Sequence, residues 1–190
     1  MKDIQIDASG NIISYTGTQK SISIPSSVYG IEITGIGDNV FKDKDITEII
    51  LPKTVTKIGN SAFENCTLLK SVVGYGINTI GNRAFYNCEM FRNPYFDNII
   101  SIGEYSFYNV CSKQYLLYEL AYNLNLDNVT SIPKGAFMNS AISSAEFNTK
   151  KALEQYEKRK TILCPCAGFC NVLYICIANG GGRQQHRQSR

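Results

Sequence analysis

Apolar residues recur along this 190-residue chain at a fixed interval. An Ile, a small residue, three variable positions and a Phe appear four times at steps of 22 residues, and a fifth time after 30. The five pairs are Ile36 and Phe41, Ile58 and Phe63, Ile80 and Phe85, Ile102 and Phe107, and Ile132 and Phe137. A period of this length indicates an architecture of stacked repeats.

The positions between these pairs predict how each repeat folds. Apolar residues at 46, 49 and 51 predict a short strand that ends at Pro52, because proline cannot donate to a strand ladder. One such unit cannot close a core alone, so we expect stacking to place Phe on Phe and Ile on Ile. In two copies an Asn-Cys pair follows one residue after the Phe, and its cysteines are Cys66 and Cys88. These repeated positions can form a ladder that satisfies buried backbone groups.

The regular spacing is interrupted once. Between Phe107 and Leu126 there are 19 positions, against 11 between Phe85 and Phe96, so residues 110–125 hold eight extra residues. Insertions of this kind map to loops or extra helical turns on one face. We therefore divide the chain into a cap or strand segment (1–20), a repeat array (21–148) and a C-terminal tail.

The tail differs from the array in composition and period. Residues 149–160 predict a short capping helix, with Thr149 as its N-cap and basic residues at its C-terminal end. Residues 161–178 carry no charge and four cysteines, and they are followed by a basic polar end at 179–190. Three interpretations stay open for 161–190: a membrane-associated segment through 161–178, a metal or disulfide site, or an end without an evolved role, such as an out-of-frame one.

The distribution of charge and the scarcity of catalytic residues limit the possible functions. The net charge of +3 divides into −3 over residues 1–149 and +6 over 150–190, so nothing in the array argues for nucleic-acid binding. The only histidine, His186, stands in the polar tail, which makes a Ser-His-Asp or Cys-His arrangement improbable. We expect no enzymatic activity, no cofactor and no metal site.

The segment from Ile46 to Cys66 reads Ile-Thr-Glu-Ile-Ile-Leu-Pro-Lys-Thr-Val-Thr-Lys-Ile-Gly-Asn-Ser-Ala-Phe-Glu-Asn-Cys. It closely resembles the BspA-like leucine-rich repeat family, and the resemblance extends over most of the array. It implies a curved, right-handed solenoid with one short strand per repeat, and a buried ladder thiol rather than a disulfide at Cys66 and Cys88. It also implies a surface or secreted protein that attaches to host matrix proteins or other cells.

The resulting hypothesis is a non-enzymatic module that binds a protein partner, as in cell-surface adhesion. The first residues contain no apolar run of signal-peptide length, so the alternative is a cytoplasmic scaffold without a host ligand. Alternation along the strands places candidate binding residues between the core positions, where aromatic and Arg side chains are suitable anchors. These residues are Thr47, Glu48, Ile50, Lys70, Arg92 and Tyr95.

Overall fold

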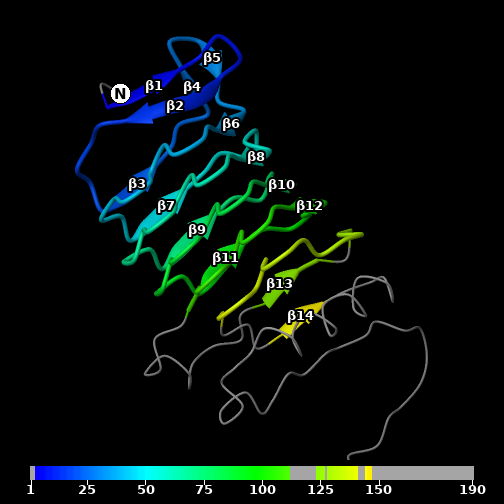
Figure 1. Cartoon of the computed structure of the whole chain (residues 1–190). Coiled ribbons are helices and arrows are strands. Elements are labelled where there is room, and N and C mark those ends of the chain that lie inside the picture. The colour runs from blue at the N-terminus through cyan, green and yellow to red at the C-terminus, as the bar shows by residue number, and fades with distance from the viewer. Residues whose placement is uncertain (1–2, 112–122, 127, 141–143, 147–190) are drawn as a thin grey trace, which may run out of the picture.

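The chain folds into a solenoid whose successive turns stack along one axis (Figure 1). The computed structural model describes residues 3–111, 123–126, 128–140 and 144–146. The expected capping helix (149–160), the segment 161–190 and most of the insertion lie outside the described residues. Within the segment 1–20, strands form from Ile4 onward.

Two parallel ladders run side by side along the solenoid (Figure 1). Sheet A contains, in spatial order, β1 (Ile4–Ile6), β2 (Asn11–Tyr15), β6 (Gly35–Ile36), β8 (Lys57–Ile58), β10 (Thr79–Ile80) and β12 (Ser101–Ile102). Sheet B contains β3 (Ser21–Ser23), β7 (Glu48–Ile50), β9 (Ser71–Val73) and β11 (Asn93–Tyr95). Beyond β11, β13 (Asn123–Asn125) pairs in parallel with β14 (Ser144–Glu146).

Each repeat therefore contributes two short strands and not the single one expected. The expected strand is β7 and its counterparts in sheet B. The second strand holds the Ile of each Ile-Gly pair. These Ile residues pair with one another along sheet A: Ile36 with Ile58, and Ile58 with Ile80. Two residues are too few to show the alternation by which a strand is recognised in a sequence.

Both sheets point their regular apolar positions inward. In sheet A the register places Ile12, Ile36, Ile58, Ile80 and Ile102 in one buried row. In sheet B the corresponding row contains Ile22, Ile49 and Val72, also buried. Because side chains alternate across a strand, the residues on either side of these rows face outward.

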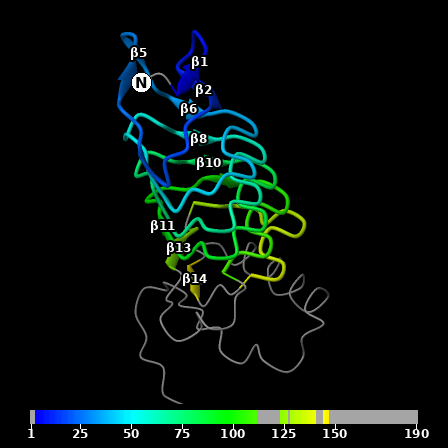
Figure 2. The ribbon, with the colours of Figure 1, turned by 90° about the vertical axis from the view of Figure 1, so that its left-hand side faces the viewer.

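A column of phenylalanine rings fills the space enclosed by the turns. Ring centroids lie 5.1 Å apart for Phe41 and Phe63, 5.3 Å for Phe63 and Phe85, and 5.4 Å for Phe85 and Phe107. Phe137 continues the column at 5.4 Å from Phe107, and Tyr15 closes its N-terminal end at 5.2 Å from Phe41. These stacked rings form the core common to both sheets. Figure 2 shows the turns superposed along the axis.

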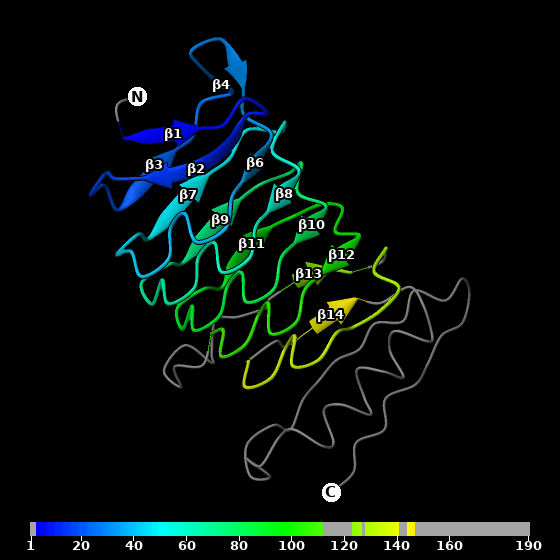
Figure 3. The same ribbon diagram turned by 45° about the horizontal axis from the view of Figure 1, so that its top comes forward.

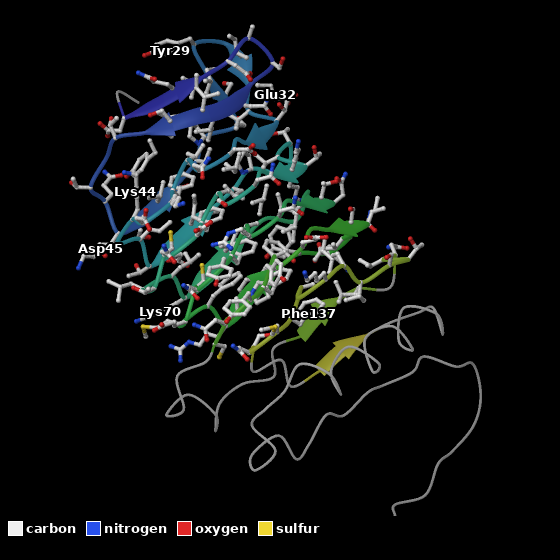
Figure 4. The ribbon with its side chains drawn as sticks, viewed as in Figure 1. Tyr29, Glu32, Lys44, Asp45, Lys70 and Phe137 are labelled. Carbon is white, nitrogen blue, oxygen red and sulfur yellow. The ribbon has the colours of Figure 1, made fainter. Side chains whose placement is uncertain are left out.

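A hairpin that the sequence analysis missed projects from the first repeat. Residues Ser27–Val28 (β4) pair antiparallel with Ile31–Glu32 (β5), across a turn in which Tyr29 and Gly30 have φ of 53° and 80°. Positive φ at both central residues is the geometry of a tight hairpin turn that twists with its strands. Tyr29 is 83% exposed, and Figure 4 shows it at the N-terminal end of the solenoid, opposite Phe137. Figure 3 shows β4 at the same end.

Candidate binding face

The outward face of sheet B carries a row of apolar side chains. The register stacks Ser23, Ile50, Val73 and Tyr95 across the four strands. Ile50 is 43% exposed and Tyr95 is 48% exposed, while Val73 between them is half-buried. Stacking thus brings together three apolar residues that are more than twenty positions apart in the chain.

Cationic residues line the edge where the sheet B strands begin. The backbone N–H of Lys70 donates to the Thr47 carbonyl at 2.8 Å, and that of Arg92 donates to the Lys70 carbonyl at 3.1 Å. Thr47, Lys70 and Arg92 are therefore consecutive in one stacked row. Lys20 comes before them in this row, because its carbonyl accepts from the Thr47 N–H at 2.7 Å. Lys70 is exposed and Arg92 half-buried; Figure 4 labels Lys70 at this edge.

Glu48 lies between the cationic edge and the apolar row. It pairs in register with Ser21 and Ser71, and the Ser21 hydroxyl donates to Glu48 Oε2 at 3.4 Å. Thr47 and Glu48 are half-buried. The six residues selected from the sequence lie in three stacked rows of sheet B, which we together call the sheet B face: Thr47, Glu48, Ile50, Lys70, Arg92 and Tyr95.

Polar ladders on the turn side explain why Asn recurs there. Asn65 Nδ2 donates to Asp43 Oδ1 at 2.8 Å, and Asn87 Nδ2 donates to Asn65 Oδ1 at 3.0 Å. Asn109 extends the ladder to Asn87 at 3.2 Å. All four residues have positive φ, a conformation that Asn and Asp tolerate better than other side chains. These side chains bond mainly to one another, so they stabilise the turn geometry and not the buried backbone.

The cysteines at the repeated position bond to buried carbonyls instead. Cys66 Sγ donates to the Phe41 carbonyl at 2.9 Å, and Cys88 Sγ donates to the Phe63 carbonyl at 3.0 Å. Both thiols are free and buried. Burial raises the pKa of Cys66 to about 12 and raises that of Cys88 well above its usual value. A thiol held in its neutral form is a poor nucleophile, so both are structural.

A charged cluster on the turn side was not anticipated from the sequence. The Arg83 guanidinium donates to both carboxylate oxygens of Glu64, at 2.9 and 3.1 Å, and Lys42 Nζ lies 3.4 Å from Glu64 Oε1. Arg83 also covers the Tyr86 ring at 3.8 Å, and that ring stacks on Tyr108 at 4.5 Å. The Arg83 bonds hold the pKa of Glu64 at about 2. The Glu64 carboxylate is therefore matched internally and is not a free binding group.

The described residues contain no helix that is long and apolar enough to cross a membrane. Within the same residues, no group of three or more His, Cys, Asp or Glu side chains is placed to hold a metal ion.

Two short strands per turn, an inward Ile row and a Phe-Asn-Cys turn define a leucine-rich repeat solenoid. A model of the BspA-type leucine-rich repeat region matches six copies over residues 9–119 and 34–158. The chain belongs to this family. No curated protein matches it.

Solved bacterial structures share the fold. A leucine-rich cell surface protein of Faecalibacterium prausnitzii is 27% identical, with a TM-score of 0.60 over 76% of this chain and 42% of its own. The T. pallidum leucine-rich repeat protein TpLRR is 24% identical, with a TM-score of 0.65 over 76% of this chain and 69% of its own. The pneumococcal vaccine antigen PcpA is 15% identical, with a TM-score of 0.57 over 82% and 44%. The chain spans less than half of the Faecalibacterium protein.

Proposed function

We propose that the chain is a binding module of a cell-surface protein and that the sheet B face contacts a protein ligand on a host or neighbouring cell. The observation that carries the proposal is the exposed apolar row of Ile50, Val73 and Tyr95 beside the cations Lys70 and Arg92. Aromatic and Arg side chains are enriched among the residues that dominate binding energy at protein interfaces.

Two further observations support the proposal. The Ile and Phe rows already complete the interior, so the outward residues of sheet B are free to serve recognition. The Faecalibacterium relative is a cell surface protein, and this chain matches it over 76% of its own length. Since repeat scaffolds present extended surfaces to macromolecules, a protein ligand fits this face better than a small molecule does.

A binding assay with matched surface variants tests the face. The purified chain is applied to a panel of immobilised extracellular-matrix proteins, alongside the double variant Ile50→Ser/Tyr95→Ser. We expect binding to at least one matrix protein, reduced at least tenfold in the double variant. The control is Ile100→Ser, because Ile100 is 52% exposed but lies beside sheet A. Equal losses in the variant and the control would contradict the assignment of the face.

The location is tested separately. Intact cells that produce the protein are treated with a membrane-impermeant amine label, which reacts with exposed lysines such as Lys20 and Lys70. We expect these lysines to be labelled without lysis. Labelling only after lysis would disprove the surface location and favour a cytoplasmic scaffold.

A further inference from the structure

The two sheets end differently at the N-terminal end of the solenoid. Sheet A continues two strands beyond β6: β2 pairs in parallel with β6, and β1 closes the sheet as an antiparallel strand. Sheet B stops at β3, which follows β2 and precedes β6 along the chain. At about 4.8 Å per strand, the sheet A side therefore rises roughly 5–10 Å above the end of sheet B. Figure 3 shows β1 beyond β3.

The outer edge of β3 has unpaired backbone groups. The Lys20 carbonyl accepts from Glu48 N–H at 3.2 Å, and Ile24 N–H donates to the Ile50 carbonyl at 2.9 Å, so alternate residues of β3 bond to β7. Ser21 and Ser23, which lie between them, direct their N–H and C=O groups to the opposite side. Among the described residues, these four groups have no hydrogen-bond partner, and both serines are exposed.

The core beneath this edge is nevertheless closed. Ile22 is 2% exposed, and Tyr15 and Phe41 are buried with their rings 5.2 Å apart. Here the side chains are covered while the backbone is not. The edge therefore offers backbone hydrogen-bonding groups and no apolar core surface.

We propose that the β3 edge binds an extended peptide segment of another protein, which adds to sheet B as a further strand. Its backbone exchanges up to four hydrogen bonds with Ser21 and Ser23, the mode of recognition known as β-augmentation. The short serine side chains leave the edge accessible. A second folded copy stacked end to end does not fit, because β1 and β2 extend sheet A past the end of sheet B. This site is separate from the outward sheet B face.

The test uses the intact chain labelled with ¹⁵N and a synthetic peptide of residues 45–53. This segment contains β7, which already pairs with the inner edge of β3. We expect the Ser21 and Ser23 amide signals to shift on titration and to saturate, while those of β9 stay in place. A peptide with Pro at the position of Ile49 should bind at least tenfold more weakly. Unchanged signals at millimolar peptide would overturn the proposal.

Variants of the edge provide the control. Ser23→Pro removes one outward N–H without touching the bonds to β7, and proline is tolerated at sheet edges. We expect Ser23→Pro to weaken binding at least tenfold and Ser23→Ala to change it less than twofold. Ser21→Pro replaces Ser23→Pro if the latter unfolds. Equal binding by the proline and alanine variants would contradict the proposal. So would concentration-dependent shifts without peptide, which would identify a second copy as the occupant.

Discussion

Sheets A and B are built by the same repeat, yet their outward faces differ. Inside, both present a continuous aliphatic row to the phenylalanine column. Outside, the two-residue strands of sheet A contribute Gly35, Lys57, Thr79 and Ser101, while the exposed Ile13 on β2 and Ile100 before β12 do not form a row. The corresponding outward row of sheet B contains Ile50, Val73 and Tyr95.

Close packing of successive turns limits the size of the outward residues on the sheet A side. A Cβ placed on Gly81, which follows β10, would lie 2.7 Å from both the Asn60 nitrogen and the Gly59 carbonyl carbon. Atoms do not approach that closely, so the Ile-Gly pair recurs because successive turns need the space. In the outward row of sheet B, Ile50 and Tyr95 remain exposed. Stacking of the turns therefore limits the residues on the outward side of sheet A, while the outward side of sheet B is available for recognition.

The largest expected effect comes from the core that the two sheets share. Phe85 is fully buried between Phe63 and Phe107, and Phe91 lies 4.7 Å away. We expect Phe85→Ala to lower the free energy of unfolding by about 3–5 kcal/mol, as large-to-small aromatic substitutions in cores do. Urea denaturation measures the loss. Hydrogen exchange should show β9 and β10 losing protection together; loss in only one sheet would show that the sheets are stabilised independently.

The next effect should appear on the sheet A side alone. Gly81→Ala introduces the Cβ that the neighbouring turn cannot accommodate, and overpacking of this kind costs about 1–3 kcal/mol. The matched change in sheet B is Ser71→Ala, at an outward strand position, for which we expect less than about 0.5 kcal/mol. Thermal unfolding of both variants provides the comparison. A Gly81→Ala protein as stable as Ser71→Ala would remove the physical basis for the difference between the outward sides of the two sheets.

The stacked repeat could be predicted from the sequence because its signal is repeated. Four Ile and Phe pairs in phase, with a fifth after a longer interval, indicated the solenoid and its inward rows, and the apolar positions around residue 49 indicated β7. Stacking then aligned the predicted residues in rows, because a common phase along the chain becomes a common row in space. The function of that face stays a prediction.

Features that occur once were not predictable in the same way. The hairpin β4–β5 adds five or six residues between Ile22 and Ile36 relative to the later copies, but Tyr29-Gly30 lacks the Asn or Asp that usually marks such a turn. The pair of Glu64 and Arg83 joins variable positions 19 residues apart, whose proximity depends on the pitch of the solenoid. The unpaired edge of β3 follows from where pairing stops, which no local pattern records.

The smallest predicted effect concerns the turn side, whose contribution to stability should depend on pH while that of the two sheets should not. Glu64 is the only buried charged side chain among the described residues, and its pKa is about 2, mainly because Arg83 donates to it. A carboxylate whose pKa is depressed on folding contributes stability above its unfolded pKa near 4.5, and this contribution is lost as the pH falls toward 2. Since the Arg83 side chain is 43% exposed, solvent screening reduces the contribution to about 1–2 kcal/mol.

Glu64→Gln keeps the shape of the side chain and removes its charge. We expect the variant to be less stable than the wild type by that amount at pH 6 and nearly equal to it at pH 2, as measured by urea denaturation at both pH values. A constant difference across this range would mean that Glu64 acts through packing and not through charge. Because neither sheet buries a charge in the described residues, the inward rows should contribute equally at both pH values, and only the turn side should respond.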